Sequence, residues 1–342
     1  MGTFPNFVLQ NPMDHIKDGI YVGGTLAESN IEGLKTAGIT NIISIVPNFK
    51  PSHPKDFEYL IIDELDLPTT NIIQHFNQTT NFIKDSVVQN CKILVHCVAG
   101  QSRSVAITAA YFIKENGLSV DKALGLIKEN RPQSNPNYGF VEQLNLYIEL
   151  NFKVDSSEDL YRRFVNSIAH KKFEENGYLE NPMIAEDPLL VLQNKQKAQN
   201  SIMKPGEGSN QLQVVNNGII KREIGIKCKK CRRLLLSESN IFEHEAGPGN
   251  IGFSYTKVNN FGAEAVGGNM AGKPKNNCSS IFFEPISWIK DIHSGVISGK
   301  IMCPKCDTKL GQFSWAGSKC SCGKWVTPSF QIHNSKIDYP RN

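Results

Sequence analysis

The sequence contains no long run of apolar residues. No segment of its 342 residues approaches the roughly 18 uninterrupted apolar residues that a membrane-spanning helix needs. The N-terminal segment MGTFPNFVLQNPMDHIKDG lacks the basic start, apolar stretch and small-residue cleavage site of a secretory signal. Asn6 stands where a myristoylation motif requires Ser or Thr. These absences argue against a membrane partner, and we expect a protein of the cytoplasm and nucleus.

Cysteine is scarce in the first two thirds of the chain and common in the last third. Of the nine cysteines, Cys91 and Cys97 precede residue 216 and all others follow it. Thiols stay reduced in the cytoplasm and nucleus, so we expect catalytic or metal-binding cysteines rather than disulfides.

Charge is also divided unevenly along the chain. Residues 1–215 contain 19 Lys and Arg against 24 Asp and Glu, a balance of −5, whereas residues 216–342 contain 18 against 9, a balance of +9. The two balances sum to the formal net charge of +4. A chain of this length is expected to form two domains. The basic second part is expected to meet a polyanion.

The pattern of apolar residues predicts alternating strands and helices up to residue 150. Short apolar runs bounded by turn residues indicate strands, and longer segments with apolar residues at helical spacing indicate helices. The expected strands are at 20–22, 40–46, 59–62 and 92–96, and the expected helices are at 30–34, 70–88, 105–115, 120–130 and 139–150. This order predicts an α/β domain with a mixed central sheet flanked by helices.

Beyond residue 150 the composition changes twice. Residues 156–172 have the pattern of an amphipathic helix, and the polar residues 173–215 are expected to form an irregular linker with a short apolar docking patch at 189–192. The Cys- and Gly-rich segment that follows has short apolar runs, as expected of a small β domain. We therefore place the domains at 14–150 and 216–342, with a helix and linker at 151–215.

The segment HCVAGQSRS at 96–104 joins an expected strand to an expected helix. Cys97 would lie at the tip of the strand, where the backbone N–H groups of residues 98–103 can curl around a phosphate. Gly100 permits the tight bend, and the start of the helix directs its positive end to the same place. That field and Arg103 would lower the pKa of the Cys97 thiol and so make it a nucleophile. The planar guanidinium of Arg103 can bind two phosphate oxygens.

This segment resembles the signature His-Cys-x-x-Gly-x-x-Arg-Ser of the protein tyrosine phosphatase superfamily, and specifically of its dual-specificity branch. The signature is matched in full by His96, Cys97, Gly100, Arg103 and Ser104. The segments IKDGIYVGG and RPQSNPNYGFVEQL also resemble the family, so that the resemblance covers residues 14–150. It implies a phosphatase domain that hydrolyses phosphoryl groups on protein Tyr, Ser or Thr through a phosphocysteine intermediate, without a metal ion.

The resemblance also implies a role for each residue of the site. The phosphate would be bound by the loop residues Val98, Ala99, Gly100, Gln101, Ser102 and Arg103. Ser104 would donate a hydrogen bond to the departing thiolate, and His96 would hold the loop. The family's general acid is an Asp on a loop about thirty residues before the nucleophile. In YLIIDELDLPTT, Asp66 aligns with that acid, and Asp63, at the end of the preceding strand, is the alternative.

The cysteines of the last third have the spacing of metal ligands. The pairs CKKC and CPKC each have Cys-x-x-Cys spacing, and such turns direct two thiolates at one tetrahedral zinc ion. Eight ligands close two four-coordinate sites, so that one histidine is needed besides the seven cysteines. The candidates are Cys228, Cys231, Cys278, Cys303, Cys306, Cys320 and Cys322, with His244, His293 or His333.

The same segment resembles the C-terminal zinc-binding domain of one eukaryotic group of dual-specificity phosphatases, the yeast phosphatase related to the vaccinia enzyme and its animal counterparts. The matching pieces are CKKCRRLLL, FEHEAG, NCSSIFFEPISWI, CPKCDTKLGQFSW and CSCGKWVTPSFQIHNSKID, which include His244 and His333 but not His293. We expect two structural Zn²⁺ sites, one of Cys228, Cys231, Cys303 and Cys306 and one of His244, Cys278, Cys320 and Cys322. Sequential pairing of Cys303, Cys306, Cys320 and Cys322 is an alternative, as is His333 in place of His244.

The basic second part is also suited to bind a nucleic acid. Seven thiolates and two Zn²⁺ ions would reduce its balance to about +6, and the first cysteine pair is surrounded by Lys229, Lys230, Arg232 and Arg233. Such a surface fits a phosphate backbone. The resemblance implies a role in maturation of the large (60S) ribosomal subunit, through binding of pre-60S particles with their rRNA and ribosomal proteins. The alternative is a non-catalytic assembly factor in which phosphatase activity is dispensable.

Overall fold

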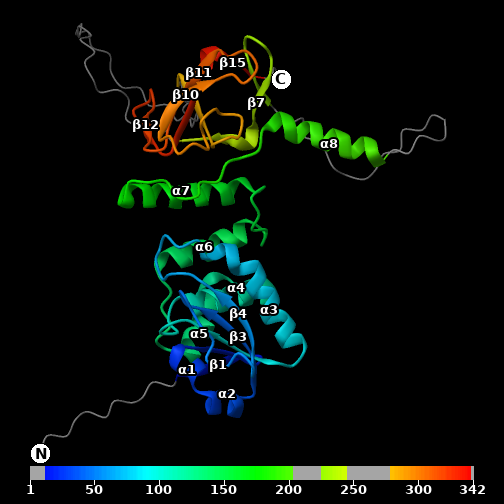
Figure 1. The fold of residues 1–342 in the computed structure, drawn as a ribbon, viewed down its shortest axis with the longest axis vertical. Helices are drawn as coiled ribbons and strands as arrows, with labels where there is room; N and C mark the ends of the chain where they lie inside the picture. Colours follow the sequence, from blue (N-terminus) through cyan, green and yellow to red (C-terminus); the bar gives the residue numbers. More distant parts are fainter. Residues whose placement is uncertain (1–11, 203–224, 245–277, 340–342) are drawn as a thin grey trace, which may run out of the picture. The chain divides into compact units, whose positions relative to one another are not determined.

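The computed structural model describes residues 12–202, 225–244 and 278–339 (Figure 1). The chain divides into two compact units, Met1–Tyr161 and Arg162–Asn342. None of the described helices is long and apolar enough to cross a membrane.

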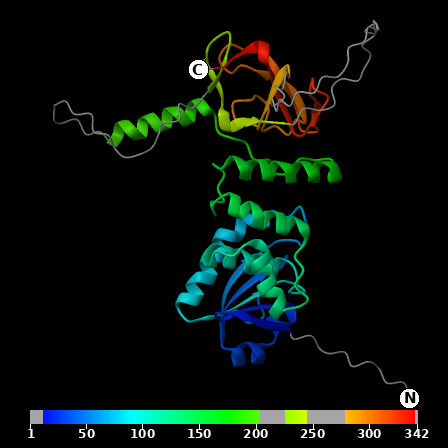
Figure 2. The same cartoon turned by 180° about the vertical axis from the view of Figure 1, so that it is seen from behind.

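The first unit is built on a five-stranded mixed sheet (Figure 2). Its strands are β1 (Met13–Lys17), β2 (Ile20–Gly23), β3 (Ile39–Ile45), β4 (Glu58–Ile62) and β5 (Lys92–His96). Their order across the sheet is β1-β2-β5-β3-β4, with β1 antiparallel to β2 and the other pairs parallel. Because β5 is central, its carboxyl end lies where ligands of such sheets commonly bind. The predicted fold class is confirmed.

Helices cover both faces of this sheet. Leu94 and Ile42 pack with Leu34 on the face of α1 and α2. Because side chains alternate along a strand, Ile93 and Val95 face the other way, and α3 and α4 contact β5. The helices are α1 (Thr25–Ser29), α2 (Ile31–Ala37), the 3₁₀ turn η1 (Ile72–His75), α3 (Phe76–Val88), α4 (Arg103–Asn116), α5 (Val120–Asn130) and α6 (Tyr138–Glu149).

The second unit consists mainly of short strands around an aromatic core. The strands are β6 (Gly225–Cys228), β7 (Leu234–Ser237), β8 (Ile241–Phe242), β9 (Ser280–Phe283), β10 (Ser298–Met302), β11 (Lys309–Ser314), β12 (Ser318–Lys319), β13 (Trp325–Val326), β14 (Ser329–His333) and β15 (Ile337–Asp338). They form sheets of order β10-β11-β14-β9-β8 and β15-β6-β7 and the hairpin β12-β13. Phe330 contacts Phe283, Phe313 and Trp315 at the centre of the core.

Two helices precede these strands. The helix predicted at 156–172 is confirmed as α7 (Asp159–Asn176). The prediction of an irregular linker is wrong at α8 (Pro188–Ile202). A carboxylate oxygen of Asp187 accepts a hydrogen bond from the Leu189 amide at 3.0 Å, and Pro188 suits a first helical position. The Lys, Gln and Ala residues that follow are good helix formers, so their polarity does not indicate a linker.

Candidate active site and metal-binding clusters

The loop between β5 and α4 is held in a tight curve by its glycine. Gly100 has φ +71°, and a Cβ atom at this position would lie 2.4 Å from the carbonyl oxygen of Gly23. Gly100 is therefore required both by its backbone conformation and by the close approach of β2. The curve places Cys97 at one end of the loop and Arg103, the first residue of α4, at the other.

The thiol of Cys97 is buried at the bottom of this loop, with 1% of the residue exposed. Its sulfur accepts a hydrogen bond from the amide of Gly100 at 3.3 Å and lies 3.4 Å from Oγ of Ser104. Burial raises the pKa of the thiol, but the hydrogen bonds of Ser104 and Gln101 and the charge of Arg103 outweigh burial and lower it overall. The arrangement thus favours a thiolate, the form of cysteine that acts as a nucleophile.

The guanidinium of Arg103 is buried beside the loop, and one of its N–H donors lacks a hydrogen-bond acceptor. Nη1 donates to the backbone carbonyl of Glu64 at 2.9 Å. Nε lies 3.4 Å from Oδ2 of Asp66, within ion-pair distance, yet it lacks the geometry of a hydrogen bond to any described residue. A buried charged donor without an acceptor is costly unless an anion binds there. The site therefore fits a phosphate group.

The structure brings Asp66 to the loop and leaves Asp63 outside it. Oδ1 of Asp66 accepts hydrogen bonds from Oγ of Ser102 at 2.7 Å and from Nδ2 of Asn137 at 2.8 Å. Asp63 instead accepts from the amide of Asn48 at 3.2 Å, beyond the end of β4. Asp66 therefore lies beside the loop, which is the position that a general acid needs, whereas Asp63 does not.

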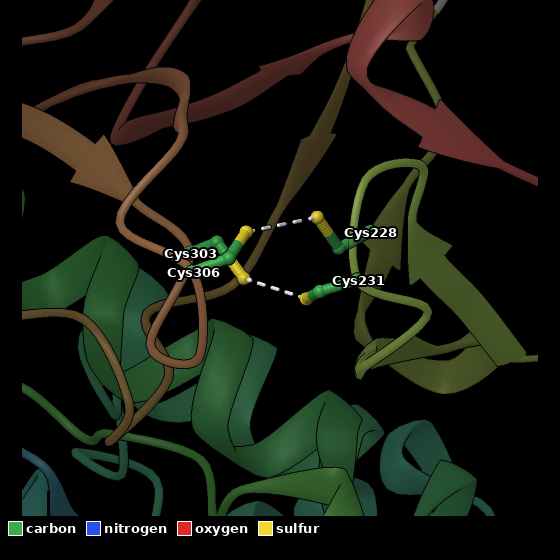
Figure 3. A group of neighbouring side chains, drawn as sticks. All are labelled: Cys228, Cys231, Cys303 and Cys306. Atoms are coloured by element: carbon green, nitrogen blue, oxygen red, sulfur yellow. Dashed lines mark hydrogen bonds between the residues drawn. The ribbon is translucent and has the colours of Figure 1, made fainter.

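Two groups of side chains that could hold a metal ion lie in the second unit. Cys228 and Cys231 meet Cys303 and Cys306, and Figure 3 shows these thiols facing one another from two separate turns. The Sγ atoms of Cys231 and Cys303 are 3.5 Å apart, and those of Cys228 and Cys306 are 3.8 Å apart. None of the chain's nine cysteines forms a disulfide.

The second group joins a histidine to three cysteines. Nε2 of His244 lies 3.6 Å from Sγ of Cys278 and 3.4 Å from Sγ of Cys322, and Cys320 completes the group. His333 lies outside it, because its Nδ1 pairs with Oγ of Ser280 at 3.0 Å. The described residues therefore bring together the first of the two pairings considered from the sequence, not the sequential one.

Comparison with known proteins agrees with this geometry. The family model of the dual specificity phosphatase catalytic domain matches residues 20–149. Dual specificity protein phosphatase 12 of Homo sapiens is 33% identical over 330 residues, which cover 95% of this chain and 88% of the human protein. This chain belongs to the dual-specificity phosphatase family.

The yeast relatives of this phosphatase also match over nearly its whole length. The tyrosine-protein phosphatase yvh1 of Schizosaccharomyces pombe is 29% identical over 335 residues, covering 97% of this chain and 86% of the yeast protein. A crystal structure of the Yvh1 phosphatase domain from Chaetomium thermophilum is 26% identical and covers 42% of this chain and 99% of that chain, with a TM-score of 0.38. The family model and the human and yeast relatives confirm the resemblance inferred from the sequence motifs, and the chain is a phosphatase.

His96 holds the start of the phosphatase loop from inside the sheet. Its ring nitrogens lie 2.7 Å from Oγ of Ser44 and 3.3 Å from the carbonyl oxygen of Cys97. Burial lowers the pKa of His96 to about 4, so that the ring is neutral at pH 7. A neutral, buried ring suits a supporting role better than proton transfer.

Arg131 supports the loop from outside, a role that the sequence did not reveal. Its buried guanidinium donates to the carbonyl oxygens of Gly100 at 2.7 Å and Ala99 at 3.3 Å, and it pairs with Asp14 at 2.6 Å. By binding these carbonyl groups on the outer side, Arg131 leaves the opposite side of the loop to its amides. The only sequence signal was the segment RPQSNPNYGFVEQL, which resembles the family and contains both Arg131 and Asn137.

The two metal-ligating groups of this phosphatase fit zinc in both chemistry and spacing. A tetrahedral zinc ion has bonds of about 2.3 Å to sulfur and about 2.0 Å to nitrogen, which give edges of about 3.8 Å between sulfurs and about 3.5 Å between sulfur and nitrogen. The separations of 3.5 and 3.8 Å between sulfurs and of 3.4 and 3.6 Å between sulfur and nitrogen are close to these edges. Each group can therefore hold a metal ion.

Proposed function

We propose that this phosphatase removes phosphoryl groups from phosphorylated proteins in two steps at Cys97. The Cys97 thiolate attacks phosphorus, the bond from phosphorus to the leaving oxygen breaks, and Asp66 gives that oxygen a proton. A water molecule then attacks the phosphocysteine while the Asp66 carboxylate takes its proton, which releases phosphate and the thiolate. Ser104 stabilises that thiolate by a hydrogen bond.

The observation that carries this mechanism is the combination of a thiol whose pKa is lowered and a buried donor without an acceptor at Arg103. The first favours ionisation of the nucleophile, and the second provides a place for the phosphoryl oxygens. No step of this chemistry requires a metal ion.

Rapid quenching of the enzyme with p-nitrophenyl phosphate tests the intermediate. Mass spectrometry of the peptide that contains Cys97 should reveal an added phosphoryl group during turnover. Cys91→Ser should leave that signal unchanged, because Cys91 is outside the loop. A phosphoryl group found on another residue, or turnover without any covalent species under fast quenching, would contradict the two-step route.

We also propose that the second unit binds two structural zinc ions and docks the phosphatase on the pre-60S ribosomal particle, in the cytoplasm and the nucleus. Support comes from the fit of both ligand sets to zinc, from the resemblance of the C-terminal segment and from its positive charge. Lys229 and Lys230 are exposed beside the first cysteine group. The other two basic residues contribute less free charge, since Arg232 pairs with Asp338 and Arg233 with Asp187.

Complementation of a strain lacking its own copy of this phosphatase separates the two roles. If docking is independent of catalysis, Cys97→Ser supports large-subunit assembly, whereas Lys229→Glu with Lys230→Glu weakens co-sedimentation with pre-60S particles. Lys300→Glu is the matched control, because Lys300 is an exposed lysine on β10 of the same unit. Loss of assembly in Cys97→Ser cells, or unchanged sedimentation of the double variant, would reject this proposal.

A further inference from the structure

Exposed apolar side chains gather around the mouth of the catalytic loop. Large apolar residues are normally scattered singly over a soluble surface, and a cluster of them marks a binding surface. In the first unit the clustered residues are Leu26, Leu65, Leu67, Val98 and Tyr138, which are 48 to 78% exposed. We call these residues the apolar rim.

Hydrogen bonds and chain connections link each part of the apolar rim to the loop. The amide of Thr25, next to Leu26, donates to the carbonyl oxygen of Val98 at 3.0 Å, which places Leu26 and Val98 on adjacent segments. Leu65 and Leu67 flank Asp66 in the sequence. Asn137, which precedes Tyr138, donates to Asp66 at 2.8 Å, so that Tyr138 follows directly on a residue bound to Asp66. Four separate segments of the chain therefore bring apolar groups to the mouth.

We propose that the apolar rim binds apolar side chains on both sides of the phosphorylated residue in the substrate protein. This inference rests on the phosphatase activity at Cys97 and names the substrate that the site prefers. The sulfur of Cys97 is buried below the rim, so a substrate chain that delivers its phosphate must cover the surrounding residues. Burial of apolar neighbours of the phosphorylated residue contributes favourable binding free energy. Polar neighbours would instead lose their hydrogen bonds to water without gaining a hydrogen-bond partner on the rim.

The position of the phosphate decides which part of the substrate meets the rim. If the phosphorylated residue is a tyrosine, its ring enters the site together with the phosphate and cannot contact all four segments of the rim at once. We therefore assign the rim to the residues before and after the phosphorylated residue.

The test compares two phosphotyrosine peptides that differ only in their neighbours. In one, two leucines stand on each side of the phosphotyrosine, and in the other two serines do; both carry the same lysines at their ends. We expect kcat/KM of the wild-type chain to be about tenfold or more higher for the leucine peptide. The variant Leu26→Ser with Tyr138→Ser should reduce that ratio to within about threefold of one, because it removes burial at two sides of the mouth.

Two controls separate the rim from the chemistry. The double variant should hydrolyse p-nitrophenyl phosphate at the wild-type rate, and Val88→Ser, at an equally exposed apolar residue at the end of α3, should keep the wild-type peptide ratio.

A wild-type ratio near one, or a ratio that the double variant retains, overturns the inference. Equal loss for both peptides assigns the rim to the phosphotyrosine ring and also overturns it. No hydrolysis of p-nitrophenyl phosphate by the wild-type chain would reject the proposed function itself.

Discussion

The two units of this phosphatase use cysteine in opposite ways. In the first unit Cys97 stands alone in the loop, at the end of a central strand that is packed by helices on both faces. In the second unit seven cysteines and one histidine form two groups among short strands, of which β8, β12, β13 and β15 have two residues each. The first unit is stabilised by packing and can place a reactive thiol on that scaffold, whereas the second is expected to depend on metal ions.

Removal of metal should have the largest effect, and only the second unit should lose its fold. Binding of structural zinc contributes about 10 kcal/mol or more to the folding of small zinc domains. A chelator, or Cys303→Ser, should therefore unfold residues 225–244 and 278–339 while the first unit keeps its turnover of p-nitrophenyl phosphate. Hydrogen exchange followed by mass spectrometry measures both units in one sample. The matched control is Cys91→Ser, since Cys91 belongs to neither group. Equal protection of the second unit from hydrogen exchange with and without chelator would show that it folds without metal.

Cys97→Ser should produce the converse result. Loss of the thiolate removes the nucleophile, and turnover of p-nitrophenyl phosphate should fall by about 10⁴-fold or more. Both units should keep their wild-type hydrogen exchange, because Ser is close to Cys in size and the loop is held by Arg131 and Gly100. Activity within tenfold of wild type would show that another group attacks phosphorus.

Asp66→Asn tests which aspartate of the first unit is the general acid. General acid catalysis contributes about 10²- to 10⁴-fold, and a poor leaving group needs it most. We expect kcat/KM for phenyl phosphate to fall by about 10²-fold or more and kcat/KM for p-nitrophenyl phosphate to fall less, because kcat/KM reports the step in which the leaving group departs. Asp63→Asn is the control, because Asp63 pairs with the Asn48 amide and not with the loop. A larger effect of Asp63→Asn would reverse the assignment of the acid.

Ser104→Ala should have the smallest effect, a change in pH dependence. The hydrogen bond of Ser104 lowers the pKa of Cys97, so its loss raises that pKa. Because the thiolate is the active form, the acidic limb of kcat/KM should move to higher pH, with activity falling as pH drops through the raised pKa. The pH profile of p-nitrophenyl phosphate hydrolysis, or iodoacetate alkylation of Cys97 as a function of pH, measures the change. A limb at the wild-type pH would show that Arg103 and the loop amides set the pKa alone.

Local sequence was sufficient for most elements of the first unit, but it did not predict β1 or α1. The helices at 76–88, 103–116, 120–130 and 138–149 and the strands at 39–45, 58–62 and 92–96 follow apolar periods and turn residues that lie within each segment. The linker prediction is wrong at α8 because a polar segment can be helical: Asp187 caps the helix, and the residues after it have high helix propensity.

By itself the sequence determined the catalytic loop, because residues 96–104 are contiguous and the loop is made by one strand, one glycine and one helix start. It also indicated the seven cysteines as candidate metal ligands, because closely spaced cysteines are typical of zinc sites, but it left the histidine open. Only the tertiary structure decided that Asp66 and not Asp63 meets the loop, that Arg131 and Asn137 support it, and that His244 and not His333 joins the second metal group. Those contacts join residues that are distant along the chain, and local pattern carries no information on how distant segments meet.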